Sequence, residues 1–128
     1  MPHVTSVLAD LDRPYCLASS SDSERIRISL AVTQLAHFFE GRIFTAAMVE
    51  RAKPAPDLFL LAAARMGASP AQTLVVEDSL NGVLAAKAAG MAVWGFTGGS
   101  HYAGRDMAPA LKAAGADRVF HSMAEFWL

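Results

Sequence analysis

Short apolar runs alternate along the 128-residue chain with stretches in which apolar residues recur at helical spacing. The runs typical of strands are residues 15–18, 43–46, 74–76, 92–96 and 118–120. Helices are predicted between residues 28 and 39, 57 and 67, 79 and 90, and 107 and 114. This alternation predicts an α/β fold with a largely parallel sheet. Because no repeat, linker or low-complexity tract interrupts it, residues 1–128 are expected to belong to a single domain.

Composition and charge narrow the class of protein. With 53% hydrophobic residues, the chain is expected to build a globular domain with a moderate core. Its formal net charge of -1 gives no electrostatic reason to expect nucleic acid or an anionic membrane as a partner. The single Cys16 excludes an internal disulfide and fits a reducing cytoplasm. No segment approaches the roughly 20 apolar residues that span a bilayer, and no signal peptide is visible, so we expect a cytoplasmic protein.

Polar side chains stand where three of the predicted strands end or the next helix begins. Ser19 follows the first apolar run, Lys53 precedes a Pro-x-Pro turn, and Glu77 and Asp78 follow the run at 74–76. In open α/β sheets, ligands bind at the carboxyl ends of strands. Taken singly, each feature has an ordinary explanation, since serines and acids cap helices and most lysines lie on the surface.

Taken together, these features favour a site for a phosphoryl group. A hydroxyl at a helix N-terminus can bind an anion. Two adjacent carboxylates repel each other unless a cation lies between them, and Mg²⁺ prefers oxygen ligands. Charge neutralisation and positioning dominate phosphoryl-transfer chemistry. A hydroxyl, an ammonium and a carboxylate-bound Mg²⁺ are therefore what such a group needs.

Three segments resemble sequence motifs of the haloacid dehalogenase-like hydrolases, especially the β-phosphoglucomutase and phosphoglycolate phosphatase branch. Residues 17–21 (LASSS) are similar to the family's second motif, residues 53–59 (KPAPDLF) to its third, and residues 75–83 (VVEDSLNGV) to its fourth. The resemblance runs from about residue 7 to residue 98. It implies a Rossmann-like three-layer core with a parallel sheet, and hydrolysis of a small phosphorylated metabolite through an aspartyl-phosphate.

The resemblance also implies a role for each polar residue at the strand ends. Ser19 and the Ser20 amide would bind the transferring phosphoryl group, and Lys53 would bridge that group and the nucleophile. Asp78 would ligate Mg²⁺, and Glu77 would ligate it or support its water shell. Lys53 and Ser19 are thus the expected catalytic residues.

The nucleophile of this family lies in a first motif, an Asp-x-Asp after the central strand, and this chain has no good match to it. Asp10 and Asp12 have the spacing, but only six residues separate Asp12 from Ser19. A parallel neighbouring strand needs a crossover of a dozen or more residues, and Pro14 fits the end of a helix. We therefore expect an incomplete core that lacks the nucleophile strand and the cap domain, with no significant turnover by this chain alone.

Loss of a central strand would expose the edges of its two neighbours, which invites pairing with another chain. The sequence therefore predicts that the chain associates with itself or with a complementing N-terminal fragment, or that it joins the two neighbouring strands directly. The alternative function is non-enzymatic: a truncated homologue that acts as a binding or assembly module.

Overall fold

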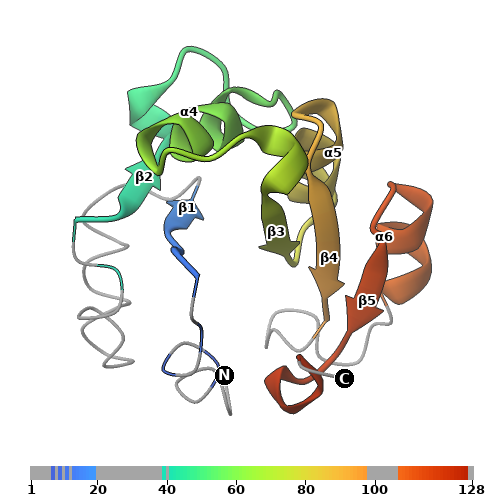
Figure 1. The fold of residues 1–128 in the computed structure, drawn as a ribbon. Coiled ribbons are helices and arrows are strands. Elements are labelled where there is room, and N and C mark those ends of the chain that lie inside the picture. The colour runs from blue at the N-terminus through green and yellow to red at the C-terminus, as the bar shows by residue number, and fades with distance from the viewer. Residues whose placement is uncertain are drawn as a thin grey trace.

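The computed structural model describes residues 7, 9, 11, 13–19, 39, 41–97 and 107–126. The described part contains two sheets, and within each sheet the strands are parallel. The two-stranded sheet pairs β1 (Leu17–Ser19) with β2 (Ile43–Thr45). The three-stranded sheet has the order β3 (Leu74–Glu77), β4 (Ala92–Phe96) and β5 (Arg118–Phe120). Figure 1 shows both sheets and their helices.

Three described helices cover these sheets. They are α4 (Asp57–Arg65), α5 (Leu80–Ala88) and α6 (Ala108–Ala113). Short 3-10 turns lie at Ala46–Met48, Pro70–Gln72 and Met123–Glu125. Helix α4 packs on β1 and β2 and also contacts α5, which packs on β3 and β4 (Figure 1). Helix α4 therefore links the two sheets.

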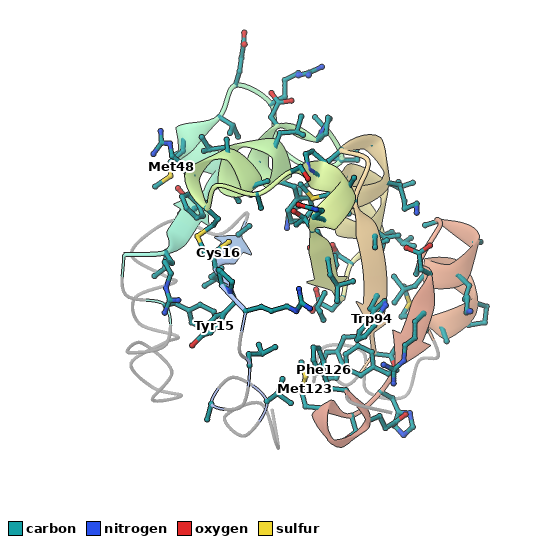
Figure 2. The ribbon with its side chains drawn as sticks, in the orientation of Figure 1. Tyr15, Cys16, Met48, Trp94, Met123 and Phe126 are labelled. Atoms are coloured by element: carbon teal, nitrogen blue, oxygen red, sulfur yellow. The ribbon has the colours of Figure 1, made fainter. Side chains whose placement is uncertain are left out.

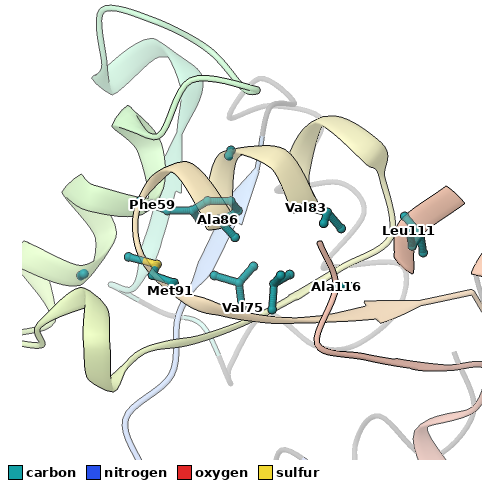
Figure 3. Close-up of a cluster of buried hydrophobic side chains, with 11 residues drawn as sticks. Phe59, Val75, Val83, Ala86, Met91, Leu111 and Ala116 are labelled. Carbon is teal, nitrogen blue, oxygen red and sulfur yellow. The ribbon is translucent and has the colours of Figure 1, made fainter. Parts of the chain in front are cut away.

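The three-stranded sheet buries side chains on both faces. On β4, Val93 belongs to the cluster beneath α5, whereas Trp94 and Phe96 pack in a second cluster with Phe120. Neighbouring residues of a strand point to opposite faces, so the two clusters lie on opposite sides of the sheet. Figure 3 shows the first cluster, and Figure 2 places Trp94 near Met123 and Phe126 in the second. The predicted α/β fold with parallel strands is confirmed.

The predicted strands are all present, with small shifts in their ends. The first runs from Leu17 to Ser19 instead of from 15 to 18, and the third extends to Glu77. Glycines with positive φ follow the described helices where the sequence predicts their ends, at Gly67 (φ 71°) and Gly90 (φ 79°). Except for Phe39, the helix predicted between 28 and 39 lies outside the described residues.

Among the described strands, none pairs across the two sheets. In the described part of the chain, β1 pairs with β2 alone and β3 pairs with β4 alone. Of the two alternatives expected from the sequence, the direct joining of β1 and β3 is therefore wrong for this structure, and association with another chain stays a prediction. A charged side chain occupies the space between them, because the Lys53 ammonium donates to the carbonyl oxygen of Ala18 in β1 and contacts Glu77 at the end of β3.

Among the described residues, no helix is long and apolar enough to cross a membrane.

Candidate active site

Lys53 belongs to the loop between β2 and α4. This loop follows β2, but it places the Lys53 side chain at the ends of β1 and β3. Within this loop, Arg51 donates to Asp57 at 2.8 Å, and this hydrogen bond holds the pKa of Asp57 below its usual range. Asp57 is also the first residue of α4, where a negative charge is favoured by the helix dipole. The Arg51–Asp57 ion pair therefore connects the loop to the first turn of α4. The Lys53–Pro54 peptide bond within the loop is cis.

The Lys53 ammonium binds groups from both sheets. Its Nζ lies 2.9 Å from Oε2 of Glu77, the last residue of β3, and donates to the carbonyl oxygen of Ala18 in β1 at 3.4 Å. The two charged side chains are only 9% and 11% exposed. At this burial, water and salt screen the attraction much less than at the surface. The ion pair therefore holds the Lys53 ammonium in a defined position between the two sheets.

The second oxygen of Glu77 is held by the chain that follows it. Oε1 accepts hydrogen bonds from the backbone N–H of Asp78 at 3.2 Å and of Ser79 at 3.3 Å, and from the Ser79 hydroxyl at 3.1 Å. The same Ser79 oxygen accepts from the Gly82 N–H at 3.0 Å and so caps α5. The Glu77 carboxylate is therefore oriented by the first turn of a helix.

Because Gly82 has no side chain, the Glu77 side chain can occupy the space where a Cβ atom of residue 82 would lie. A Cβ atom at this position would overlap the Glu77 side chain, whose Cδ, Cγ and Oε2 atoms are its nearest neighbours. Sequence reasoning assigned Gly82 no role, although a glycine in the first turn of an alanine-rich helix costs helix stability and so calls for a reason. The reason is this close approach of strand end and helix.

The structure brings together part of the predicted site. Lys53 contacts Glu77 directly and also contacts Ala18, the neighbour of Ser19; Asp78 directly follows β3. The predicted phosphate contact Ser20 lies outside the described residues, as do Asp10 and Asp12. The phosphate-binding and metal-ligating roles stay predictions.

Glu77 and Asp78 are the two adjacent carboxylates at this rim that could contribute to a magnesium site. Both oxygens of Glu77 already accept hydrogen bonds, including one from an ammonium, which suits a positioning carboxylate more than a direct ligand. Asp78 is the other carboxylate here. The described residues contain no group of three His, Cys, Asp or Glu side chains that could hold a metal. Since Mg²⁺ often uses only one or two carboxylates together with phosphate and water, Asp78 fits part of such a site.

Relatives of the chain are named as phosphatases. Putative phosphatase YhcW from Bacillus subtilis (strain 168) is 50% identical over 82 residues, which are 64% of this chain and 37% of that protein. Fructose-1-phosphate phosphatase YqaB from Escherichia coli (strain K12) is 44% identical over 79 residues, covering 62% and 42%. Phosphoglycolate phosphatase from the same strain is 36% identical over 104 residues, covering 79% and 41%.

Solved structures match nearly the whole chain. A conserved haloacid dehalogenase-like protein of unknown function from Agrobacterium tumefaciens superposes with a TM-score of 0.92 at 40% identity, covering 98% of this chain and 57% of that one. A hydrolase of the same family from Deinococcus radiodurans, with bound phosphate and sodium, gives 0.89 at 33% identity, covering 98% and 56%. A putative β-phosphoglucomutase from Thermotoga maritima gives 0.84 at 27% identity, covering 94% and 55%.

The fold is that of a parallel α/β protein, and the curated relatives that the chain matches are named as phosphatases. The family model for haloacid dehalogenase-like hydrolases matches residues 1–90, and the chain belongs to this family. The resemblance found in the sequence is thereby confirmed, including its β-phosphoglucomutase and phosphoglycolate phosphatase branch. The chain spans about two fifths of the length of these curated relatives and somewhat more than half of the solved structures, so it is incomplete relative to them.

Replacing Gly82 by alanine should destabilise the protein and displace the Glu77 carboxylate. A Gly→Ala change inside a helix ordinarily stabilises it by up to about 1 kcal/mol. Here the added Cβ would overlap Glu77, and overpacking costs about 1–3 kcal/mol. Urea unfolding followed by circular dichroism measures the sign of the change.

Asn81→Ala is the matched control, because Asn81 is the exposed neighbour of Gly82 in the same helix. It should leave stability unchanged or raise it slightly. A stabilised Gly82→Ala protein would show that the close contact with Glu77 does not exist.

Proposed function

We propose that this chain carries the phosphate-binding and metal-binding side of a cytoplasmic, Mg²⁺-dependent phosphomonoester hydrolase that acts on a small phosphorylated metabolite. The observation that carries the proposal is the Lys53 ammonium, held by Glu77 between the ends of β1 and β3. The phosphatase names of the relatives and the phosphate bound to the Deinococcus radiodurans protein support the same chemistry.

Each residue at the rim would serve a different part of a phosphoryl dianion. Lys53 would neutralise negative charge on the phosphoryl oxygens. Its ammonium would need no rearrangement to do so, because its position is fixed before the substrate arrives. Ser19, with the Ser20 amide, would donate hydrogen bonds to phosphoryl oxygens. Asp78 would hold Mg²⁺, with Glu77 orienting Lys53 and supporting the metal's water shell; the ion would supply further charge neutralisation.

Hydrolysis would also need a nucleophile, which we propose is missing from this chain. In the complete enzyme, an Asp carboxylate oxygen would form a bond to phosphorus as the bond to the leaving alcohol breaks. Water would then cleave the aspartyl-phosphate and release inorganic phosphate. Because Asp10 and Asp12 do not suit this role on the sequence argument, the chain alone should be inactive.

Binding of inorganic phosphate tests the proposed site without requiring turnover. In the presence of Mg²⁺, Lys53→Met should weaken phosphate binding about tenfold or more, because a hydrogen bond to a charged group contributes about 1.5–3 kcal/mol. Isothermal titration calorimetry or ³¹P NMR measures the affinity. Lys112→Met, at an exposed position of α6, is the control and should bind like the parent protein. Equal losses in both variants, or no binding by the parent, would contradict the proposal.

An assay with p-nitrophenyl phosphate checks the missing nucleophile. The chain should hydrolyse this substrate no faster than background. Hydrolysis that Asp10→Asn abolishes would show instead that Asp10 is the nucleophile.

A second candidate function is that of a non-catalytic binding or assembly module. One observation favours it: in the described part of the chain, β1 and β3 each pair with a strand on one side only. Strand edges of this kind can accept a strand from another chain. The partner would be a second copy or a complementing N-terminal fragment.

Multi-angle light scattering of the purified chain tests this candidate. We expect a mass at least twice that of the 13.6 kDa chain, or a shift to a one-to-one complex when a complementing fragment is added. A stable monomer that ignores such a fragment would rule the assembly role out.

A further inference from the structure

The Lys53 ammonium has a third partner, which the phosphatase mechanism does not call for. In addition to the Ala18 carbonyl on β1 and Glu77 on β3, the ammonium lies over the Phe59 ring of α4, with Nζ 4.7 Å from the ring centroid. This distance is within the range of a cation–π interaction. The ammonium is therefore held from three elements of the fold at once.

The Phe59 ring is itself fixed by the core. Its side chain is only 6% exposed and belongs to the buried cluster that also contains Val75, Val83 and Ala86. Figure 3 shows Phe59 beside Ala86, under α5. Because Phe59 also lies in the first turn of α4, the packing of α4 against α5 determines where the ring face stands.

An aromatic ring at this position would restrict the movement of the lysine ammonium, which is otherwise poorly oriented for binding an anion. The ammonium is a compact charge on a flexible four-carbon stem, and it lacks the planar fork with which arginine fixes its own orientation. Glu77 attracts the ammonium but does not by itself limit the path of the stem. The ring covers another side of the ammonium with a face of negative potential. This face attracts the ammonium but carries no net charge that would neutralise it.

We propose that Phe59 is a positioning residue, whose ring face keeps the Lys53 ammonium between β1 and β3. The contact between ring and ammonium is a property of the protein without any ligand. Its consequence for anion binding rests on the proposed function.

Substitution of Phe59 by 3,4,5-trifluorophenylalanine tests the proposal. Fluorination makes the ring face electron-poor and weakens its attraction for a cation, while the ring keeps its shape. The effect of the substitution on the unfolding equilibrium constant is measured twice, once in the parent protein and once in a Lys53→Met variant. If the ring attracts the ammonium, the increase in this constant should be about five times larger in the parent protein than in the Lys53→Met variant. The same substitution at Phe96 is the control, because Phe96 is also 6% exposed but packs against Phe120 in the other cluster.

Phosphate binding gives the second measurement. The trifluoro substitution at residue 59 should weaken the affinity for inorganic phosphate about fivefold, whereas the substitution at residue 96 should leave it unchanged. Equal unfolding effects with and without Lys53 would overturn the proposal, as would equal effects at residues 59 and 96. If the parent protein binds no phosphate, the proposed function fails, and the unfolding comparison still decides the role of Phe59.

Discussion

The ion pair between Lys53 and Glu77 is the interaction on which the rest of the site depends. Both side chains are nearly buried, and a buried charge is strongly unfavourable unless a partner and hydrogen bonds compensate it. Each group therefore requires the other. Since Lys53 also donates to Ala18, the pair connects β3 with β1, two strands that share no backbone pairing. It joins the two sheets with one charged contact.

The position of this pair is set by helix α5 and its packing. Ser79 caps the helix and donates to Glu77, and Gly82 leaves room for the carboxylate. Farther along the helix, Ala85 and Ala86 are fully buried. Small side chains let the helix approach the sheet closely, so its N-terminal turn lies directly against the end of β3. Core packing, helix capping and the geometry of the site are therefore parts of one arrangement.

Much of the fold could be predicted from the sequence, because periodicity and helix-ending glycines are local signals. The run at 92–96 is the strand that the structure contains, and Gly67 and Gly90 have the expected positive φ. For the candidate site, the sequence predicts that Lys53 and Glu77 lie at the same rim, but it does not predict that they form an ion pair. The family resemblance implies that Glu77 ligates the metal or supports its water shell, and it says nothing of an ion pair with Lys53. Its partner Lys53 lies 24 residues earlier, and only the topology brings the two together.

A double-mutant cycle of Lys53→Met and Glu77→Gln tests the central claim most directly. Removing one partner of a buried pair costs about 3–5 kcal/mol, much of it from the charge left behind. We therefore expect each single change to lower the free energy of unfolding by about 3 kcal/mol, and the double change to cost clearly less than the sum. Effects that add to within about 0.5 kcal/mol would show that the two side chains are not paired.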